Sequence, residues 1–364
     1  MAKLVTYPDL YTHRKYSILP SECQEIAYEI GKALNSNSLE KHQIDKFRTN
    51  FGNLEPSCVS RALIEIRDIA NIRRSYRPQE YPTSFLGRFQ NIWKKLTELK
   101  VMNVESEAGW IFIFHGDGYL RQSGLSSLNS PPQSPFEFTS IVYRLNDWVE
   151  NVRNKAITFA TLRFPETKSD IISESAFFLL EQSEYLLRWN DHSRRLLQQQ
   201  LFRPDVLLNL KDKFLKNRTG RLAYVLSHLL RRPEFDIYLE ELALHAELPQ
   251  VRAVAFDALL NERAIWPTGY KKIWIDKVYG VSGRERVTQT RHITHSLDVQ
   301  NLLSLAASDN SAVVRKVAAN SLIALPNKNI PEKDMRDLAT CLSRDKSKSV
   351  RKIAEFYLNK VDTN

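Results

Sequence analysis

The fold of this chain is indicated by a ten-residue phrase, D-N-S-A-V-V-R-K-V-A, at Asp309–Ala318. The phrase returns as D-K-S-K-S-V-R-K-I-A at Asp345–Ala354 and as D-W-V-E-N-V-R-N-K-A at Asp147–Ala156. In each copy an Asp stands six residues before an Arg, a Val directly precedes that Arg, and an Ala follows three residues later. A fourth copy, L-P-Q-V-R-A-V-A at 248–255, keeps the Val-Arg and the Ala but lacks the Asp. Recurrence of this kind indicates a repeat architecture.

The apolar residues that follow each phrase are spaced as on one face of an α-helix. In the last copy they fall at i, i+3, i+4, i+7 and i+8, at Val350, Ile353, Ala354, Tyr357 and Leu358. A second apolar segment of helical length precedes the phrase, at 297–307 for one copy and 335–342 for another. The unit is therefore predicted to be two antiparallel helices joined by a tight polar turn.

A set of arginines marks the pitch of the predicted repeat. Their separations are 32, 35, 33, 31, 32, 31 and 36 residues. Three of them, at 188, 221 and 284, are included by spacing alone. The full set is Arg121, Arg153, Arg188, Arg221, Arg252, Arg284, Arg315 and Arg351.

The Asp-Val-Arg-Ala phrase resembles the HEAT-repeat family, especially its short bacterial form. The resemblance implies an all-α fold, a right-handed α-solenoid of antiparallel helix pairs with a pitch of about 31–36 residues. It also implies that Asp and Arg form a polar ladder between the turns of successive repeats, which is a structural role. The ladder residues expected on this basis are Asp147, Arg153, Arg252, Asp309, Arg315, Asp345 and Arg351.

The phrase and its interruptions divide the chain into four parts. Residues 1–80 look helical but lack the phrase, so we expect a helical N-terminal cap. Residues 81–263 and 297–364 are expected to hold HEAT-like repeats. Between them, residues 264–296 contain W-P-T-G-Y and G-V-S-G, whose Pro and Gly predict a loop or broken helix inserted within a repeat.

Composition places the chain among folded, basic proteins. The 364 residues carry a net charge of +10, and residues 201–364 account for +8 of it, with 27 Lys and Arg against 19 Asp and Glu. The three cysteines are far apart and form no disulfide framework or CxxC metal site. No apolar run suits a signal peptide or a membrane span. We therefore expect a cytoplasmic protein that does not bind membranes.

Recognisable catalytic motifs are missing from the sequence. F-H-G-D-G-Y at 114–119 lacks the spacing of a phosphate-binding loop, and no G-x-S-x-G elbow or nucleophilic Cys context occurs. His292 and His295 have no Cys, Asp or Glu pair at ligand spacing beside them, so they are expected to be exposed histidines rather than zinc ligands. The sequence thus favours a protein that is not an enzyme, with no cofactor, catalytic residue or metal site to name.

Basic and aromatic residues in the C-terminal half are the candidates for partner contacts. Trp266, Tyr270, Trp274 and Tyr279 are interleaved with lysines, as in proteins that stack on bases, although packing of Tyr270 and Trp274 into the core is the preferred interpretation. Basic clusters around 211–221 and 284–291 could line one edge of the repeats. The candidate contacts are Lys211, Lys213, Lys216, Arg218, Lys271, Lys272, Trp274, Arg286 and Arg291.

Two functions remain open at this point. The first is a non-enzymatic scaffold that binds a protein partner on the concave face of the repeats. The alternative is a HEAT-repeat protein that contacts the backbone of DNA or RNA through its basic C-terminal half. Fold and charge also allow a DNA repair or defence protein similar to the HEAT-like alkylpurine glycosylases, although no catalytic residue can be carried over from them.

Overall fold

The computed structural model of the chain is mostly helical and describes residues 17–72, 106–182, 188, 190–324 and 330–362. It divides into two compact units. Unit 1 comprises Met1–Leu179 and Tyr185–Arg203, and unit 2 comprises Leu180–Glu184 and Pro204–Asn364. Parts of the expected N-terminal cap (1–16 and 73–80) and of the first expected repeat (81–105) lie outside the described residues.

Unit 1 is built from short helices. Helix α5 packs on α6, and both α6 and α7 pack on α8. In the expected cap, α1 contacts α2 and α3, α2 reaches α5 and α7, and α3 reaches α7. The described elements are α1 (Ser21–Ser36), α2 (Lys41–Gly52), η2 (Pro56–Cys58), α3 (Val59–Ile69), η3 (Ser106–Ala108), α5 (Gly109–Phe112), α6 (Gly118–Ser127), α7 (Pro135–Leu145), α8 (Glu150–Arg163), η4 (Phe164–Glu166), α9 (Ser169–Gln182) and α10 (Asp191–Leu201).

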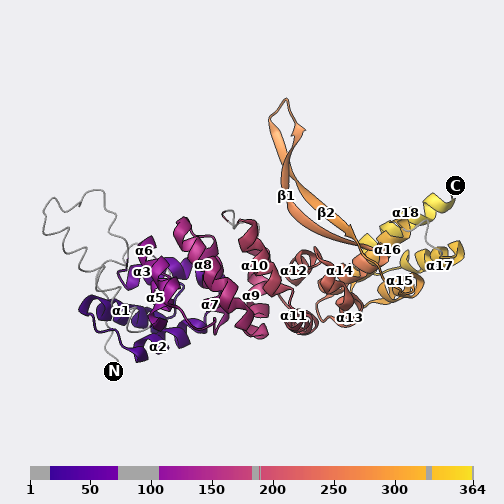
Figure 1. The fold of residues 1–364 in the computed structure, drawn as a ribbon. Coiled ribbons are helices and arrows are strands. Elements are labelled where there is room, and N and C mark those ends of the chain that lie inside the picture. The colour runs from indigo at the N-terminus through magenta and orange to yellow at the C-terminus, as the bar shows by residue number, and fades with distance from the viewer. Residues whose placement is uncertain (1–16, 73–105, 183–187, 189, 325–329, 363–364) are drawn as a thin grey trace, which may run out of the picture. The chain divides into compact units, whose positions relative to one another are not determined.

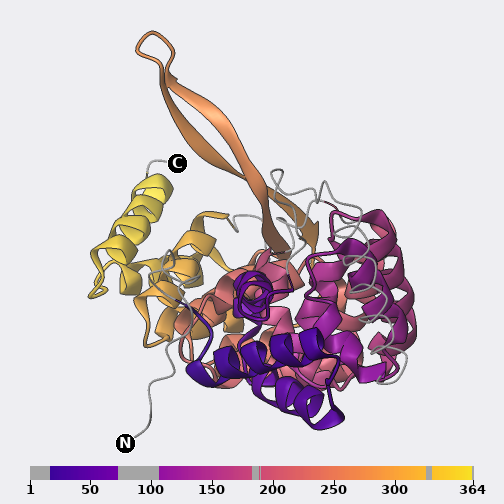
Figure 2. The ribbon, with the colours of Figure 1, turned by 90° about the vertical axis from the view of Figure 1, so that its left-hand side faces the viewer.

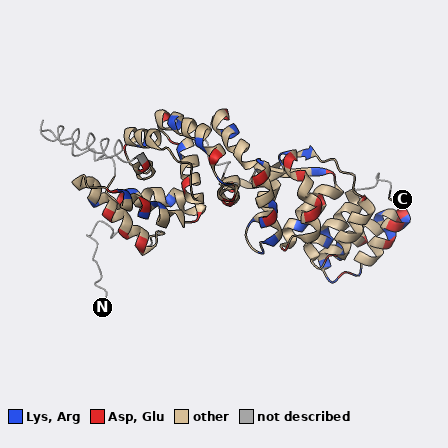
Figure 3. Ribbon diagram, turned by 60° about the horizontal axis from the view of Figure 1, so that its bottom comes forward, with Lys and Arg blue, Asp and Glu red and all other residues tan. Residues whose placement is uncertain are grey.

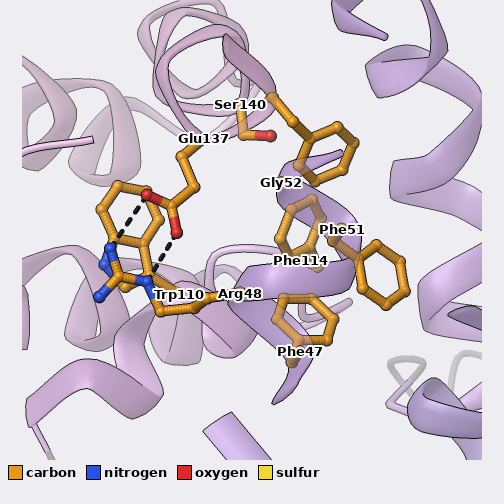
Figure 4. A pocket seen from close by; sticks show the side chains of 9 residues that line it. Phe47, Arg48, Phe51, Gly52, Trp110, Phe114, Glu137 and Ser140 are labelled. Carbon is orange, nitrogen blue, oxygen red and sulfur yellow. Dashed lines mark hydrogen bonds and ion pairs between the residues drawn. The ribbon is translucent and has the colours of Figure 1, made fainter. Parts of the chain in front are cut away.

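An aromatic cluster forms part of the core of unit 1 (Figure 4). The rings of Phe47 and Phe51 stack with centroids 4.2 Å apart, and Phe114 stacks on Phe136 at 5.9 Å. At the edge of this cluster Arg48 donates to both carboxylate oxygens of Glu137, at 2.6 and 3.0 Å. The space left among these side chains is only about 10 Å³, so the cluster is a packed core and not a ligand pocket.

Unit 2 combines paired helices with a two-stranded sheet. Helix α13 packs on α14, α15 on α16 and α17 on α18, and the second helices contact each other in the order α14, α16, α18. The elements are α11 (Pro204–Lys216), α12 (Leu222–Leu229), η6 (Pro233–Tyr238), α13 (Leu239–His245), α14 (Pro249–Leu260), β1 (Arg263–Asp276), β2 (Val281–His292), α15 (Val299–Ser308), α16 (Ala312–Ala324), α17 (Glu332–Leu342) and α18 (Lys348–Asp362).

The repeated phrase forms the turn before the second helix of a pair and the start of that helix. The Arg of each phrase donates from Nη1 to two carbonyls of its own turn: Arg315 reaches those of Asp309 and Asn310 at 2.8 and 2.9 Å. The Asp accepts a backbone N–H two residues on, as Asp309 does from Ser311 at 2.7 Å. The Val before the Arg and the Ala after it are fully buried, for example Val314 and Ala318. Each position of the phrase thus has a local structural reason.

The same arginines also join one turn to the next. Arg252 donates from Nε and Nη2 to the two carboxylate oxygens of Asp309 at 2.8 and 2.9 Å, and Arg315 does so to Asp345 at 2.6 and 3.0 Å. In unit 1 Arg121 pairs with Asp147 in the same way, at 3.0 and 2.8 Å. Arg153 and Arg351 bind the carbonyls of their own turns. In unit 2, Arg252 and Arg315 thus join consecutive turns by bidentate ion pairs.

The insertion differs from its prediction. Residues 263–292 form a long antiparallel hairpin of β1 and β2, not a loop or broken helix, so the fold is not purely helical. Figures 1 and 2 show this hairpin extending away from the helices of unit 2. Arg284, assigned to the repeat pitch by spacing alone, lies in β2 and marks no helix pair. Arg252 and Arg315 are 63 positions apart, and 33 remain once the 30 hairpin residues are set aside, so one repeat separates them.

Candidate nucleic-acid interface

The hairpin ends in a hydrogen-bonded turn, and its strand pairing has two irregularities. Asp276 Oδ1 accepts the N–H groups of Val278 and Tyr279 at 2.8 and 3.1 Å, and Gly280 adopts a φ of 68°, which favours glycine. The pairing shifts between Pro267 and Gly269 and again between Trp274 and Asp276, each time with one extra residue on β1. Between the two shifts the strands alternate regularly, which assigns each side chain to one of two faces.

Hydrogen bonds fix the base of the hairpin to unit 2. Arg291 donates from Nε to the carbonyl of Leu230 at 2.7 Å and from Nη1 to Asp236 at 2.7 Å. Arg231 donates to the carbonyl of Pro267 at 3.1 Å. Arg291 was a predicted partner contact, but its guanidinium is already used to hold the hairpin in place. It is therefore a positioning residue for this element.

One face of the hairpin is basic. In the register Tyr270 pairs with Arg286, Lys272 with Arg284, and Trp274 with Ser282, so these six side chains share a face. Lys272 Nζ lies 3.9 Å from the centroid of the Trp274 ring, a cation–π contact. Three cations and two aromatic rings occupy this face without a carboxylate. We call Tyr270, Lys272, Trp274, Arg284 and Arg286 the ribbon face.

On the opposite face of the hairpin, the positive charge is balanced by a carboxylate. Lys271 and Glu285 are paired in the register and form an ion pair of 2.8 Å. Gly283 is paired with Ile273 on the same side. Lys271, a predicted contact, therefore lies away from the ribbon face, whereas Lys272, Trp274 and Arg286 lie on it. The hairpin, residues 263–292, carries seven Lys and Arg against two Asp and Glu. Three of these cations, Lys272, Arg284 and Arg286, lie on the ribbon face.

The aromatic residues of the insertion are not mainly core residues, which corrects the preferred interpretation of the sequence. Tyr270 and Trp274 are 67% and 50% exposed, and Tyr279 at the tip is 82% exposed. Trp266, at the base, is only 9% exposed and does pack inward. The i, i+4 spacing of Tyr270 and Trp274 suggested one helical face, but on a strand these positions share a face that the core does not cover.

A pocket of about 430 Å³ opens at the base of the ribbon face. Helices α12 and α14 supply Tyr224 and Asp257, the hairpin supplies Trp266 and Arg286, and α16 supplies Val317. Its other lining residues are mostly apolar: Ala223, Ser227, Leu230, Ala253, Val254, Ala258, Arg263, Ile265, Pro267 and Thr288. A second hollow lies farther out along the ribbon face, lined by Tyr270, Lys272, Ser282, Gly283 and Arg284.

Titratable groups around the pocket are perturbed by burial. Burial raises the pKa of Asp257, whose Oδ1 accepts a hydrogen bond from Asn261 Nδ2 at 2.8 Å. Burial also lowers the pKa of His228 to about 4, helped by the charges of Arg231 and Arg286. His228 is therefore neutral at pH 7, with its ring 4.4 Å from that of Tyr224. His228 therefore adds no positive charge beside the Tyr224 ring.

The predicted basic cluster at 211–221 is largely compensated by nearby carboxylates. Lys211 lies 3.1 Å from Asp212 and 3.3 Å from Glu241, and hydrogen bonding to Asp212 raises its pKa. Arg218 is 3.5 Å from Glu247. Lys213 and Lys216 lie in the last turn of α11, where positive charge stabilises the helix dipole. Figure 3 shows basic and acidic segments interspersed along the helices, so this cluster is a weaker candidate than the ribbon face.

Sequence reasoning missed three pocket residues, Tyr224, Asp257 and Arg263. Nothing in the sequence distinguishes Tyr224 or Asp257 from the other polar positions of amphipathic helices. The hairpin itself had a usable signal, because two runs rich in β-branched and aromatic residues, 263–276 and 281–292, flank the short turn segment K-V-Y-G. Recognising those strands would have placed Arg284 and Arg286 on one face of β2, while their side relative to Lys272 depends on the register.

Neither a metal cluster nor a membrane span occurs in the described part of the chain: no three His, Cys, Asp or Glu side chains there could hold an ion, and no helix there is long and apolar enough to cross a bilayer. His292 and His295 hydrogen-bond the main-chain carbonyls of Glu262 and Leu259, both at 2.8 Å.

No protein-family model matches the chain, and no curated protein matches it either.

Proposed function

We propose that this protein binds nucleic acid through the ribbon face of its hairpin. The observation that carries the proposal is the clustering of Lys272, Arg284 and Arg286 with two exposed aromatic rings on one face that holds no carboxylate. Cations spaced along a strand suit a phosphate backbone, and exposed rings suit unstacked bases. A two-stranded ribbon is also narrow enough to enter the major groove of a duplex.

The helices serve as the support of this element. We propose that the helix pairs are HEAT-like repeats stacked as a solenoid, because the bidentate pairs Arg252–Asp309 and Arg315–Asp345 recur at consecutive turns. Arg252 reaches Asp309 across the whole insertion, 57 residues away in sequence. The hairpin is thus inserted between two repeats that remain joined at their turns, and Arg291 fixes its base.

Matched charge reversals on the two faces of the hairpin test the proposal. Arg284→Glu on the ribbon face and Lys271→Glu on the opposite face change the net charge equally within one hairpin. Fluorescence anisotropy with labelled single-stranded and duplex oligonucleotides at low salt should show at least tenfold weaker binding for Arg284→Glu, about 1.4 kcal/mol. Lys271→Glu should have a much smaller effect. Equal losses in the two variants, or no binding by the unmodified protein, would contradict the proposal.

A protein-binding role is the second candidate, favoured by the apolar tip of the hairpin. Ile275, Val278 and Tyr279 are 69%, 89% and 82% exposed. Exposed apolar side chains that lie together are unfavourable in water and are typical of protein-binding sites. The predicted binding of a protein on a concave repeat face stays a prediction. Affinity capture with the unmodified chain and with a variant carrying Ser at these three positions separates the two functions. A partner that is lost with the variant, in nuclease-treated extract, would favour protein binding.

A further inference from the structure

The pocket at the base of the ribbon face differs in chemistry from the face itself. Its walls are mostly apolar, and Trp266 and Tyr224 contribute aromatic surface. Arg286 belongs to both features, since it lines the pocket and lies 6.0 Å from the Tyr224 ring centroid. At about 430 Å³ the pocket is within the range of small-ligand sites and matches a single nucleotide better than a peptide segment.

Asp257 is the only carboxylate among the pocket-lining residues. Asn261 Nδ2 donates to Asp257 Oδ1 at 2.8 Å, and the hydrogen bonds of the described residues leave Asp257 Oδ2 as an unused acceptor. A carboxylate on the pocket wall can accept a hydrogen bond from a ligand, and the exocyclic amino groups of cytosine, adenine and guanine are suitable donors. Thymine and uracil have no exocyclic amino group and offer only their ring N3–H on that edge.

Two guanidiniums complete the arrangement. Arg263 and Arg286 are exposed residues that line the pocket. A phosphate attached to a base in the pocket would meet positive charge at this position, and the phosphates beyond it would meet Arg284 and Lys272 along the ribbon face. Mostly apolar walls, a single carboxylate and outer cations together match a heteroaromatic base that carries an amino group and a phosphate.

We infer that this pocket binds one unpaired nucleotide with an amino-bearing base, through stacking on its apolar walls and a hydrogen bond to Asp257. The inference rests on the proposed function, because it treats the pocket as the end of the ribbon face. The same chemistry has two sources, a nucleotide within a strand and a free mononucleotide.

The test uses the full chain and a variant that fills the pocket. Val254→Phe on α14 places a ring among the lining residues, and Leu244→Phe, at an exposed position of α13, is the matched control. The strand arm measures anisotropy with oligothymidylate and with the same strand carrying one central dA, dC or dG. We expect each amino-bearing base to tighten binding about tenfold relative to thymine, close to the contribution of one hydrogen bond to a carboxylate. Val254→Phe and Asp257→Ala should abolish that gain, and Leu244→Phe should retain it.

The free-nucleotide arm titrates AMP, CMP and UMP by calorimetry into the same proteins. Binding of AMP and CMP that exceeds binding of UMP and is lost with Val254→Phe would identify a free nucleotide as the ligand. The inference is overturned if neither arm responds to base identity or to Val254→Phe. Strand binding that is lost with Arg284→Glu but unchanged by Val254→Phe would overturn it while leaving the proposed function intact. Binding of AMP and CMP by a protein that does not bind strands would support the pocket inference and contradict the proposed function.

Discussion

Removal of the Asp309 carboxylate tests the role of the ion pairs between turns. Asp309→Ala deletes two hydrogen bonds from Arg252, at 2.8 and 2.9 Å, and one from the N–H of Ser311 at 2.7 Å. The side chains of Arg252 and Asp309 are only 14% and 12% exposed. The variant therefore leaves a largely buried guanidinium with backbone carbonyls as its remaining partners. Breaking such a pair by removing one member costs about 3 kcal/mol.

Hydrogen exchange followed by mass spectrometry measures this cost locally. At about 1.4 kcal/mol per tenfold change, amides of α14 and α16 should exchange about one hundredfold faster in Asp309→Ala. Asp337→Ala, which removes an exposed carboxylate in the same unit, is the control and should change exchange less than threefold. Peptides from unit 1 provide an internal reference. Equal effects of the two variants, or acceleration spread evenly over both units, would refute the structural role of the pair.

Three further predictions concern acid stability and the hairpin. Hydrogen bonds from Arg315 lower the pKa of Asp345 below its ordinary 3.8, so this carboxyl stabilises the fold above that pH and the stabilisation is lost as the pH falls below it. Arg315→Met should weaken that acid dependence in denaturant melts from about pH 5 down to about pH 2. Arg291→Met should make the amides of the hairpin exchange at least tenfold faster and leave the exchange rates of α18 unchanged. Hydrogen exchange followed by mass spectrometry checks this. Trp266→Ala should cost about 3 kcal/mol of stability and Tyr279→Ala less than 0.5 kcal/mol in urea denaturation; similar costs would contradict the assigned burial.

The helices of the repeats were predictable because their determinants are local. The phrase around Arg315 contains its own turn contacts and its own apolar face, so a short window of sequence is sufficient. The ion pairs made by Lys211 and Arg218 were not predictable, because Glu241 and Glu247 lie 30 and 29 residues away and meet them only in the folded chain.

The hairpin was missed for a different reason. Pro267, Gly269, Gly280 and Gly283 punctuate it so often that the local pattern resembles a loop, although three of them lie within strands and one in the turn. Which side of the hairpin carries charge depends on the register and on the shift at Pro267 and Gly269. Neither is fixed by composition, so the ribbon face could be identified only from the paired strands.

The salt dependence of binding tests the central claim most directly. If Lys272, Arg284 and Arg286 contact phosphates, replacing all three with Ala should reduce the slope of log K against log salt by about 2 for single-stranded nucleic acid, since each contact contributes about 0.7. A control with Ala at Lys316, Lys346 and Lys352, three exposed lysines of unit 2, loses the same charge and should keep the original slope. Equal slopes for the unmodified protein and the ribbon-face variant would contradict the claim.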